Sequence, residues 1–222
     1  MLSARPLALA VAALLATTPS AIAQTPAPGD PGTSPALLDA GLIPVRKHAP
    51  SIQLNIIGAT KRNVTDQVLP GYCKPWALLR ANAAKALARA HYALRKKGIG
   101  LKVYDAYRPV RATNALVAWA INSGHPEYVG TKIARRSNHN LGSAVDVSLF
   151  ATETGKELNM GADVDDLDDS SITTNAKGKA LANRLRMKAA LEREGFRNYS
   201  QEWWHYDFHP LGPRRIDVPL GC

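Results

Sequence analysis

Three residues in two short motifs have the side chains of a metal site. His139 and Asp146 lie seven positions apart in the stretch 137–149 (SNHNLGSAVDVSL), and His205 ends the run EWWH at 202–205. Two imidazoles and one carboxylate fill three positions of a tetrahedral zinc ion and leave the fourth open for water, which is typical of catalytic zinc sites. The sequence therefore predicts one catalytic zinc ion per chain.

The other four histidines are interpreted as surface or packing residues. His48 lies in a segment with little regular pattern, His91 is placed on the polar side of a predicted helix, and His125 and His209 each precede a proline. Partial burial or exposure is the usual state of a histidine. None of the four is predicted to bind the metal.

Glu202 is the candidate general base. It lies three residues before His205, so its carboxylate can reach the attacking water if the chain turns between the two residues. Trp203 and Trp204 stand between them and are expected to exclude bulk water. Burial of this kind would raise the pKa of the carboxyl group towards a useful range for acid and base catalysis.

Arg108 is the candidate for stabilising negative charge. It follows a predicted strand, and a fixed guanidinium there can stabilise an oxyanion or hold a carboxylate. The alternative role is a salt bridge to an acidic neighbour such as Asp105.

Two other metals fit the sequence less well. Non-haem iron also uses two histidines and a carboxylate, but those enzymes need no neighbouring glutamate base. An EF-hand calcium loop counted from Asp163 would need glycine at its sixth position and glutamate at its twelfth, and the chain has Asp168 and Thr174 there.

The elements that must position these residues alternate between helix and strand. Val145, Val147 and Leu149 alternate with Asp146, so Asp146 is expected to face a cavity. The polar connection 123–143 is long enough to be functional. We predict an α+β fold, a single compact domain with a central antiparallel sheet flanked by helices and the metal site at the sheet face. Periodicity and composition place helices at 76–97, 111–122 and 175–194, and strands at 100–107, 144–150 and 205–208.

The N-terminus has the pattern of an export signal. Residues 1–23 combine an early arginine, a short apolar run and an A-x-A site ending at Ala23, which predicts a cleaved signal peptide and a periplasmic protein. Residues 24–36 are rich in Pro, Gly and Thr and predict a disordered leader. The remaining 37–222 suits one domain, and no segment is apolar for long enough to span a membrane.

Charge and cysteine content limit the partners. The formal net charge is +10, but Lys and Arg are spread along the chain, and together with the export signal this argues against nucleic acid. A solvated positive surface and contact with anionic cell-envelope material both remain open. Cys73 and Cys222 can pair in an oxidising compartment, although spacing alone does not decide whether they do.

Three motifs in order resemble one enzyme family. SNHNLGSAVDVSL, EWWHY and VYDAYRP are together similar to the zinc D-alanyl-D-alanine dipeptidases, the group within the D,D-peptidase superfamily that includes the vancomycin-resistance dipeptidases. The resemblance runs from about Asn63 to the C-terminus. It implies zinc held by the ligands named above, Glu202 as the base and Arg108 as the group that stabilises the transition state.

The resemblance also implies a pocket for the free amine of the substrate. In the family a serine before the first ligand and an aspartate in an M-G-x-x-F-D run bind this amine, and these positions fall on Ser137 and Asp165. Two positions depart from the family pattern: Val164 replaces the usual aromatic residue, and Gly58 stands where a tyrosine is common.

Three functions are compatible with these motifs. The first is hydrolysis of the small peptide D-alanyl-D-alanine to two D-alanine in cell-wall peptide metabolism. The second is a peptidoglycan D,D-carboxypeptidase or endopeptidase that uses the same metal site on longer stem peptides. The third, a wall-binding module without activity, is disfavoured because binding alone does not need the base Glu202.

Overall fold

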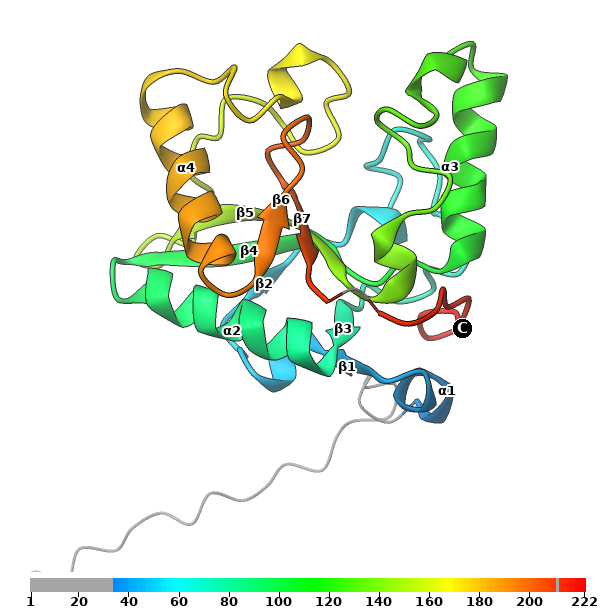
Figure 1. Ribbon diagram of the computed structural model, residues 1–222, viewed down its shortest axis with the longest axis horizontal. Coiled ribbons are helices and arrows are strands. Elements are labelled where there is room, and N and C mark those ends of the chain that lie inside the picture. Colours follow the sequence, from blue (N-terminus) through cyan, green and yellow to red (C-terminus); the bar gives the residue numbers. More distant parts are fainter. Residues whose placement is uncertain (1–33, 211) are drawn as a thin grey trace, which may run out of the picture.

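A five-stranded sheet forms the centre of the protein in the computed structural model, which describes residues 34–210 and 212–222 (Figure 1). Strands β2 and β4 are parallel, and every other neighbouring pair is antiparallel. The predicted α+β fold is therefore confirmed, with one parallel pair at the sheet edge. The strand order is β2 (Gln53–Leu54), β4 (Ile99–Asp105), β5 (Ala144–Ala151), β7 (His205–Phe208) and β6 (Phe196–Asn198).

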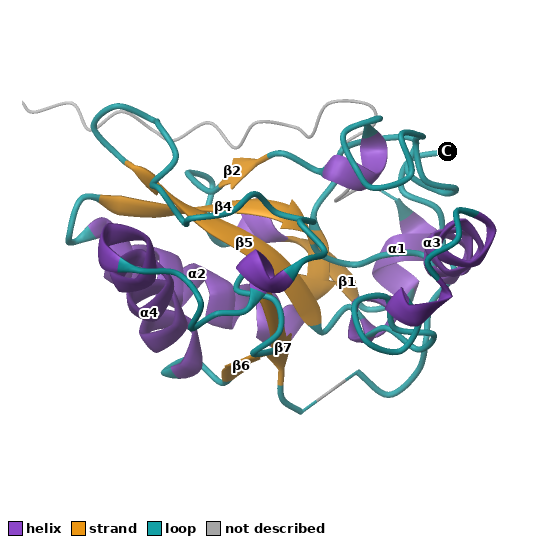
Figure 2. Cartoon of the chain, turned by 90° about the horizontal axis from the view of Figure 1, so that it is seen from above, coloured by secondary structure: helices purple, strands orange, loops and turns teal. Residues whose placement is uncertain are grey.

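Two long helices cover one side of this sheet. Helix α2 (Ala81–Arg95) packs on β4 and on α4 (Gly178–Glu192), and α4 packs in turn on β6. Figure 2 shows these two helices side by side next to the sheet, while α3 (Val110–Asn122) lies at the other end of the molecule. The remaining helical elements are α1 (Pro35–Asp39) and the short 3₁₀ turns η2 (Val45–Lys47), η3 (Ile57–Ala59), η4 (Pro126–Tyr128), η5 (Asn138–Leu141) and η6 (Asp169–Ser171).

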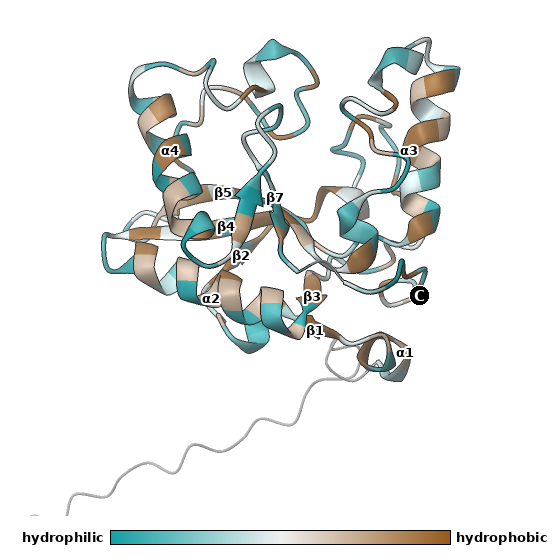
Figure 3. Cartoon of the chain, in the orientation of Figure 1, coloured by the Kyte–Doolittle hydropathy of each residue, from teal (hydrophilic) through white to brown (hydrophobic). Residues whose placement is uncertain are grey.

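The core follows the apolar periodicity of the sequence. Ala83, Leu87, Ala90 and Leu94 form the buried face of α2, with exposures of 2% or less. Alanines on this face let the helix approach the sheet closely, and burial of such a stripe is the main source of helix stability in a protein. Figure 3 shows hydrophobic residues recurring along α3 as well.

The predicted helix over 76–97 is too long at its start. Its residues Leu78–Arg80 instead form strand β3, which pairs with β1 (Leu42–Pro44) in a separate two-stranded sheet. Two adjacent leucines fit the buried face of a helix and a strand equally well, so the pattern could not separate them. The strand predicted at 205–208 agrees with β7, and the ends of the other predicted helices and strands differ from the observed ones by at most three residues.

The N-terminal predictions fall mostly outside the described residues. The predicted signal peptide at 1–23 and most of the leader lie there. Residues 35 and 36 belong to the predicted leader, but they begin helix α1, and the next residue, Leu37, is fully buried. No helix in the described ranges is long and apolar enough to cross a membrane.

His91 corrects the expectation of a residue on the polar side of α2. It is fully buried, and its Nδ1 accepts a hydrogen bond from the backbone N–H of Leu101 at 3.0 Å, while its Nε2 lies 2.9 Å from Ser51 Oγ. Burial, with the nearby charge of Arg95, lowers the pKa of His91 to about 4. The neutral ring therefore links α2 to β4 and to the segment before β2.

Cys73 and Cys222 form a disulfide, which settles the question that spacing left open. Their Cα atoms are 5.1 Å apart and 149 positions separate them in the sequence. The bridge fastens the C-terminal segment to the loop that precedes β3.

Candidate active site

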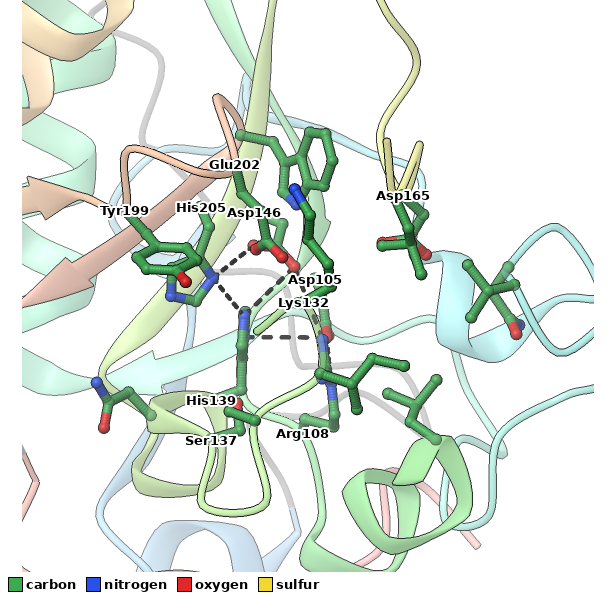
Figure 4. A pocket seen from close by; sticks show the side chains of 18 of the residues that line it. Asp105, Arg108, Lys132, Ser137, His139, Asp146, Asp165, Tyr199, Glu202 and His205 are labelled. Atoms are coloured by element: carbon green, nitrogen blue, oxygen red, sulfur yellow. Dashed lines mark hydrogen bonds and ion pairs between the residues drawn. The ribbon is translucent and has the colours of Figure 1, made fainter. Parts of the chain in front are cut away.

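Three ionisable residues lie side by side on neighbouring strands in the middle of the sheet. In the pairing register, Asp105 at the end of β4 is opposite Asp146 in β5, and Asp146 is opposite His205 at the start of β7. Directly opposed residues project from the same face of a sheet. The register therefore brings together two aspartates and one histidine from segments that are far apart in sequence (Figure 4).

His139 completes the predicted ligand set. It lies in the η5 turn just before β5, and its Nε2 is 3.1 Å from His205 Nδ1 and 3.3 Å from Asp146 Oδ2. His205 Nδ1 is also 3.0 Å from Asp146 Oδ1. Ligand atoms about 2.0–2.2 Å from a tetrahedral zinc ion lie roughly 3.3–3.6 Å apart. The three donor atoms are thus spaced closely enough for one ion.

In each histidine, one ring nitrogen is hydrogen-bonded away from the cluster, and this bond determines which ring nitrogen is available to bind a metal. His139 Nδ1 lies 2.6 Å from the carbonyl oxygen of Ala106, and His205 Nε2 lies 3.1 Å from Asp207 Oδ1. Both partners only accept, so these nitrogens carry the protons. In neutral rings the two facing nitrogens then both present lone pairs, and a cation between them removes their repulsion. The residues present fit a zinc ion, with Ala106 and Asp207 orienting the ligands.

The charges around the ligands reinforce this arrangement. Burial alone would raise the pKa of Asp146, but His139 and His205 hold it well below its usual range. Burial alone would lower the pKa of His205, but hydrogen bonds to Asp146 and Asp207 raise it well above its usual value. A metal ion that binds these residues must therefore compete with protons for them.

Glu202 lies in the turn that the sequence required. Its N–H donates to Tyr199 O at 2.9 Å, and its carbonyl accepts from the N–H of His205 at 3.2 Å, so the chain folds back between base and ligand. Glu202 is only 8% exposed and lines the same cavity as the three ligands. Burial, with contributions from Asp146 and Asp165, outweighs the effect of His205 and raises the pKa of Glu202 to about 7.

The two tryptophans next to Glu202 have different surroundings. Trp204 lines the cavity, as expected for a residue that excludes water. Trp203 instead has its ring beneath the guanidinium of Arg184, 5.3 Å from the ring centroid, and lines a neighbouring cavity. Both are almost fully buried, so only Trp204 shields the reaction space directly.

Arg108 forms the salt bridge to Asp105 that the sequence offered as its alternative role, and its guanidinium also lies near Asp146. Its Nη2 forms a 2.7 Å ion pair with Asp105 Oδ2, and the same nitrogen lies 3.7 Å from Asp146 Oδ2. Arg108 also lines the cavity. Held by Asp105, its positive charge stays beside the metal ligands.

Ser137 and Asp165 line the cavity on different sides of the ligands (Figure 4). Ser137 Oγ accepts from the N–H of His139 at 3.3 Å and so caps the η5 turn. Asp165 has a positive φ of 69°, and burial followed by repulsion from Asp146 raises its pKa to about 7. A cation bound beside Asp165 would favour its charged form.

Residues 130–134 and 136–139 of the connection 123–143 line the cavity. Lys132 Nζ is 2.8 Å from Ser171 Oγ, and Tyr199 OH donates to Thr131 O at 3.0 Å. These bonds hold residues 130–139 beside Asp146 and His205. The cavity between them has a volume of about 300 Å³. This volume lies at the lower end of the range for small-molecule sites.

Asp207 and Tyr72 belong to the network of the site and were missed in the sequence. Asp207 could have been found, because residues two apart in a strand share a face and it follows His205 by two. Tyr72 OH donates to Asp105 Oδ1 at 2.6 Å across 33 positions of sequence. No local pattern carries that contact.

Comparisons with known proteins agree on one family. The family model described as D-ala-D-ala dipeptidase matches residues 38–212. The D-alanyl-D-alanine dipeptidase of Enterococcus faecium is 32% identical over 67% of this chain and 81% of its own length, and that of Escherichia coli K12 is 32% identical over 77% and 84%. The solved LD-carboxypeptidase LdcB, at 18% identity and a TM-score of 0.46 over 78% of this chain and 69% of its own, is too distant to add to this result.

Proposed function

This chain belongs to the D-alanyl-D-alanine dipeptidase family, and on that basis we propose that it hydrolyses D-alanyl-D-alanine to two D-alanine with one zinc ion. The observation that carries the proposal is the cluster His139, Asp146 and His205 next to the buried base Glu202 in a small cavity. Family membership and site chemistry support the same reaction.

His139, Asp146 and His205 would hold the zinc ion, which would supply a Lewis acid for activating water and polarising the peptide carbonyl. Glu202 then accepts a proton from the attacking water and donates it to the departing amine, which its pKa of about 7 allows in both directions. Arg108 stabilises the negative charge that develops on the carbonyl oxygen, because its position is fixed before the reaction.

The substrate amine is proposed to lie at Asp165 and Ser137. A dipeptide is short enough to place its carbonyl near the ligands and its ammonium near Asp165 within one cavity. The ammonium would compensate the partly buried carboxylate of Asp165, whereas an acylated amine would leave that charge without its partner and so weaken binding. We further propose that the protein acts after export to the periplasm, as the predicted signal at 1–23 indicates.

The test compares three substrates. We expect zinc-loaded protein to release D-alanine rapidly from D-alanyl-D-alanine and slowly from its N-acetyl form and from a stem pentapeptide. Glu202→Gln serves as the inactive control. Equal or faster release from the two blocked substrates would contradict the dipeptidase and favour a carboxypeptidase, whose longer substrates could enter the adjoining polar cavity of about 1200 Å³ beyond Asp165.

A further inference from the structure

A buried tyrosine holds the carboxylate that holds Arg108. Tyr72 OH donates to Asp105 Oδ1 at 2.6 Å, and the backbone N–H of Ala106 donates to the same oxygen at 2.9 Å. The other oxygen, Oδ2, accepts from Nε and Nη2 of Arg108 at 2.8 Å and 2.7 Å. Tyr72 and Ala106 therefore fix the orientation of the carboxylate, and the carboxylate fixes the guanidinium.

Tyr72 does not line the reaction cavity, and its own position is tightly defined. It is 2% exposed, and its ring lies against Gly58 so closely that a Cβ added there would be 2.9 Å from a ring carbon. The departure from the family pattern at Gly58 thus makes room for this ring. Burial, followed by the charge of Asp105, raises the pKa of Tyr72 well above its usual value, so the hydroxyl keeps its proton and remains a donor.

The C-terminal segment fastens the backbone on both sides of this network. On the Tyr72 side, Leu220 N–H donates to Gly71 O at 2.7 Å, Cys73 N–H donates to Leu220 O at 3.1 Å, and the Cys73–Cys222 disulfide closes the contact. On the other side, Tyr107 OH donates to Val218 O at 2.8 Å, one residue before Arg108. One segment thus connects Tyr72 and Arg108.

We propose that Tyr72 is a positioning residue for the reaction. It acts through Asp105 to fix Arg108, and the Cys73–Cys222 disulfide keeps Tyr72 in place. The inference rests on the proposed function, because a fixed guanidinium affects the rate only if negative charge develops beside it. According to this inference, residues that never touch the substrate also determine the rate of the proposed reaction.

The first experiment compares two matched variants of the zinc-loaded enzyme. Tyr72→Phe removes the hydroxyl that holds Asp105, and kcat is expected to fall about tenfold while KM and zinc content stay the same. Tyr104→Phe is the control, because Tyr104 is in the same strand as Asp105 and also donates to a carboxylate, that of Glu157 at 2.6 Å. Its kcat should equal that of the wild type.

The second experiment asks whether the effect passes through Arg108. In an Arg108→Ala background, Tyr72→Phe should cause no further loss of kcat, because the group it positions is gone. The pair Cys73→Ser and Cys222→Ser should likewise lower kcat only when Arg108 is present, and this arm decides the question if Tyr72→Phe does not fold. Loss of the disulfide should lower the Tm both with Arg108 and in the Arg108→Ala background.

Three results would overturn the inference alone. Two of them are a normal kcat for Tyr72→Phe and an equal loss of kcat with and without Arg108. A loss of kcat in Tyr104→Phe of the same size would also overturn it, since the effect would then be general. If the wild type released no D-alanine from D-alanyl-D-alanine, the proposed function would fail first and this inference with it.

Discussion

The two ends of the cavity are built in different ways. At the metal end, Asp146 and His205 are opposite each other in paired strands, and each of the two histidines has a further partner that orients its ring. At the amine end, Asp165 lies in an irregular segment with a positive φ, and no hydrogen bond or ion pair to its carboxylate is present within the described ranges. Strand pairing thus fixes one end, whereas the substrate itself must complete the other.

The largest effect is expected from breaking the metal end. His139→Ala removes one of three ligands, so we expect both zinc and activity to be lost together, as measured by metal analysis and D-alanine release. His125→Ala is the matched control, since the His125 side chain is exposed and contacts Glu127 outside the site. Stoichiometric zinc in the His139 variant would refute the ligand assignment. His91→Ala is not a neutral control, because that ring is buried and hydrogen-bonded.

Glu202→Gln should keep the metal and lose the reaction. The amide retains the shape of the side chain but cannot accept a proton, so kcat should fall by at least about 10²- to 10⁴-fold with normal zinc content. The wild-type kcat/KM should itself decline as pH falls through the raised pKa of Glu202, because the base works only when ionised. Activity within a few-fold of wild type would mean that another residue is the base.

Asp207→Ala should weaken the metal end without abolishing it. Asp207 holds the Nε2 proton of His205 and so keeps Nδ1 free for the metal. Loss of such an orienting carboxylate lowers metal affinity about 10- to 100-fold. Competition with a chelator measures this change, and affinity equal to wild type would show that strand pairing alone orients His205.

The same Glu202→Gln variant should be more stable than the wild type when both lack metal. For a carboxyl group whose pKa rises from 4.5 to about 7 on folding, ionisation opposes folding by about 3 kcal/mol above pH 7, and this cost disappears below pH 4.5. Urea unfolding at pH 8 and at pH 4 should therefore show a gain for the variant only at pH 8. An equal difference at both pH values would contradict the burial argument.

The smallest effect is expected at the amine end. Asp165→Asn removes the charge that the substrate ammonium would meet. The ratio of kcat/KM for the free dipeptide to kcat/KM for the N-acetylated dipeptide should therefore fall by about tenfold, because one partly exposed ion pair is lost. Zinc content should not change. An unaltered ratio would place the amine elsewhere in the cavity.

Sequence patterns identified the parts of this site that depend on short-range order. His139 and Asp146 belong to one turn and strand, and Glu202 and His205 to one turn, so their spacing carries the geometry. The Tyr72 contact with Asp105 depends on long-range packing, which no local period encodes. The same limit explains His91, whose partners Ser51 and Leu101 come from other elements.

The pairing of Asp146 with His205 also affects how the chain assembles. Shifting β7 by one residue along β5 would turn His205 to the opposite face of the sheet and separate it from Asp146. Only the native alignment can then bind the ion tightly, so zinc selects the correctly paired sheet from misaligned collapsed forms. Refolding with zinc present should therefore give a higher yield of native protein than refolding with a chelator, even before any substrate is added.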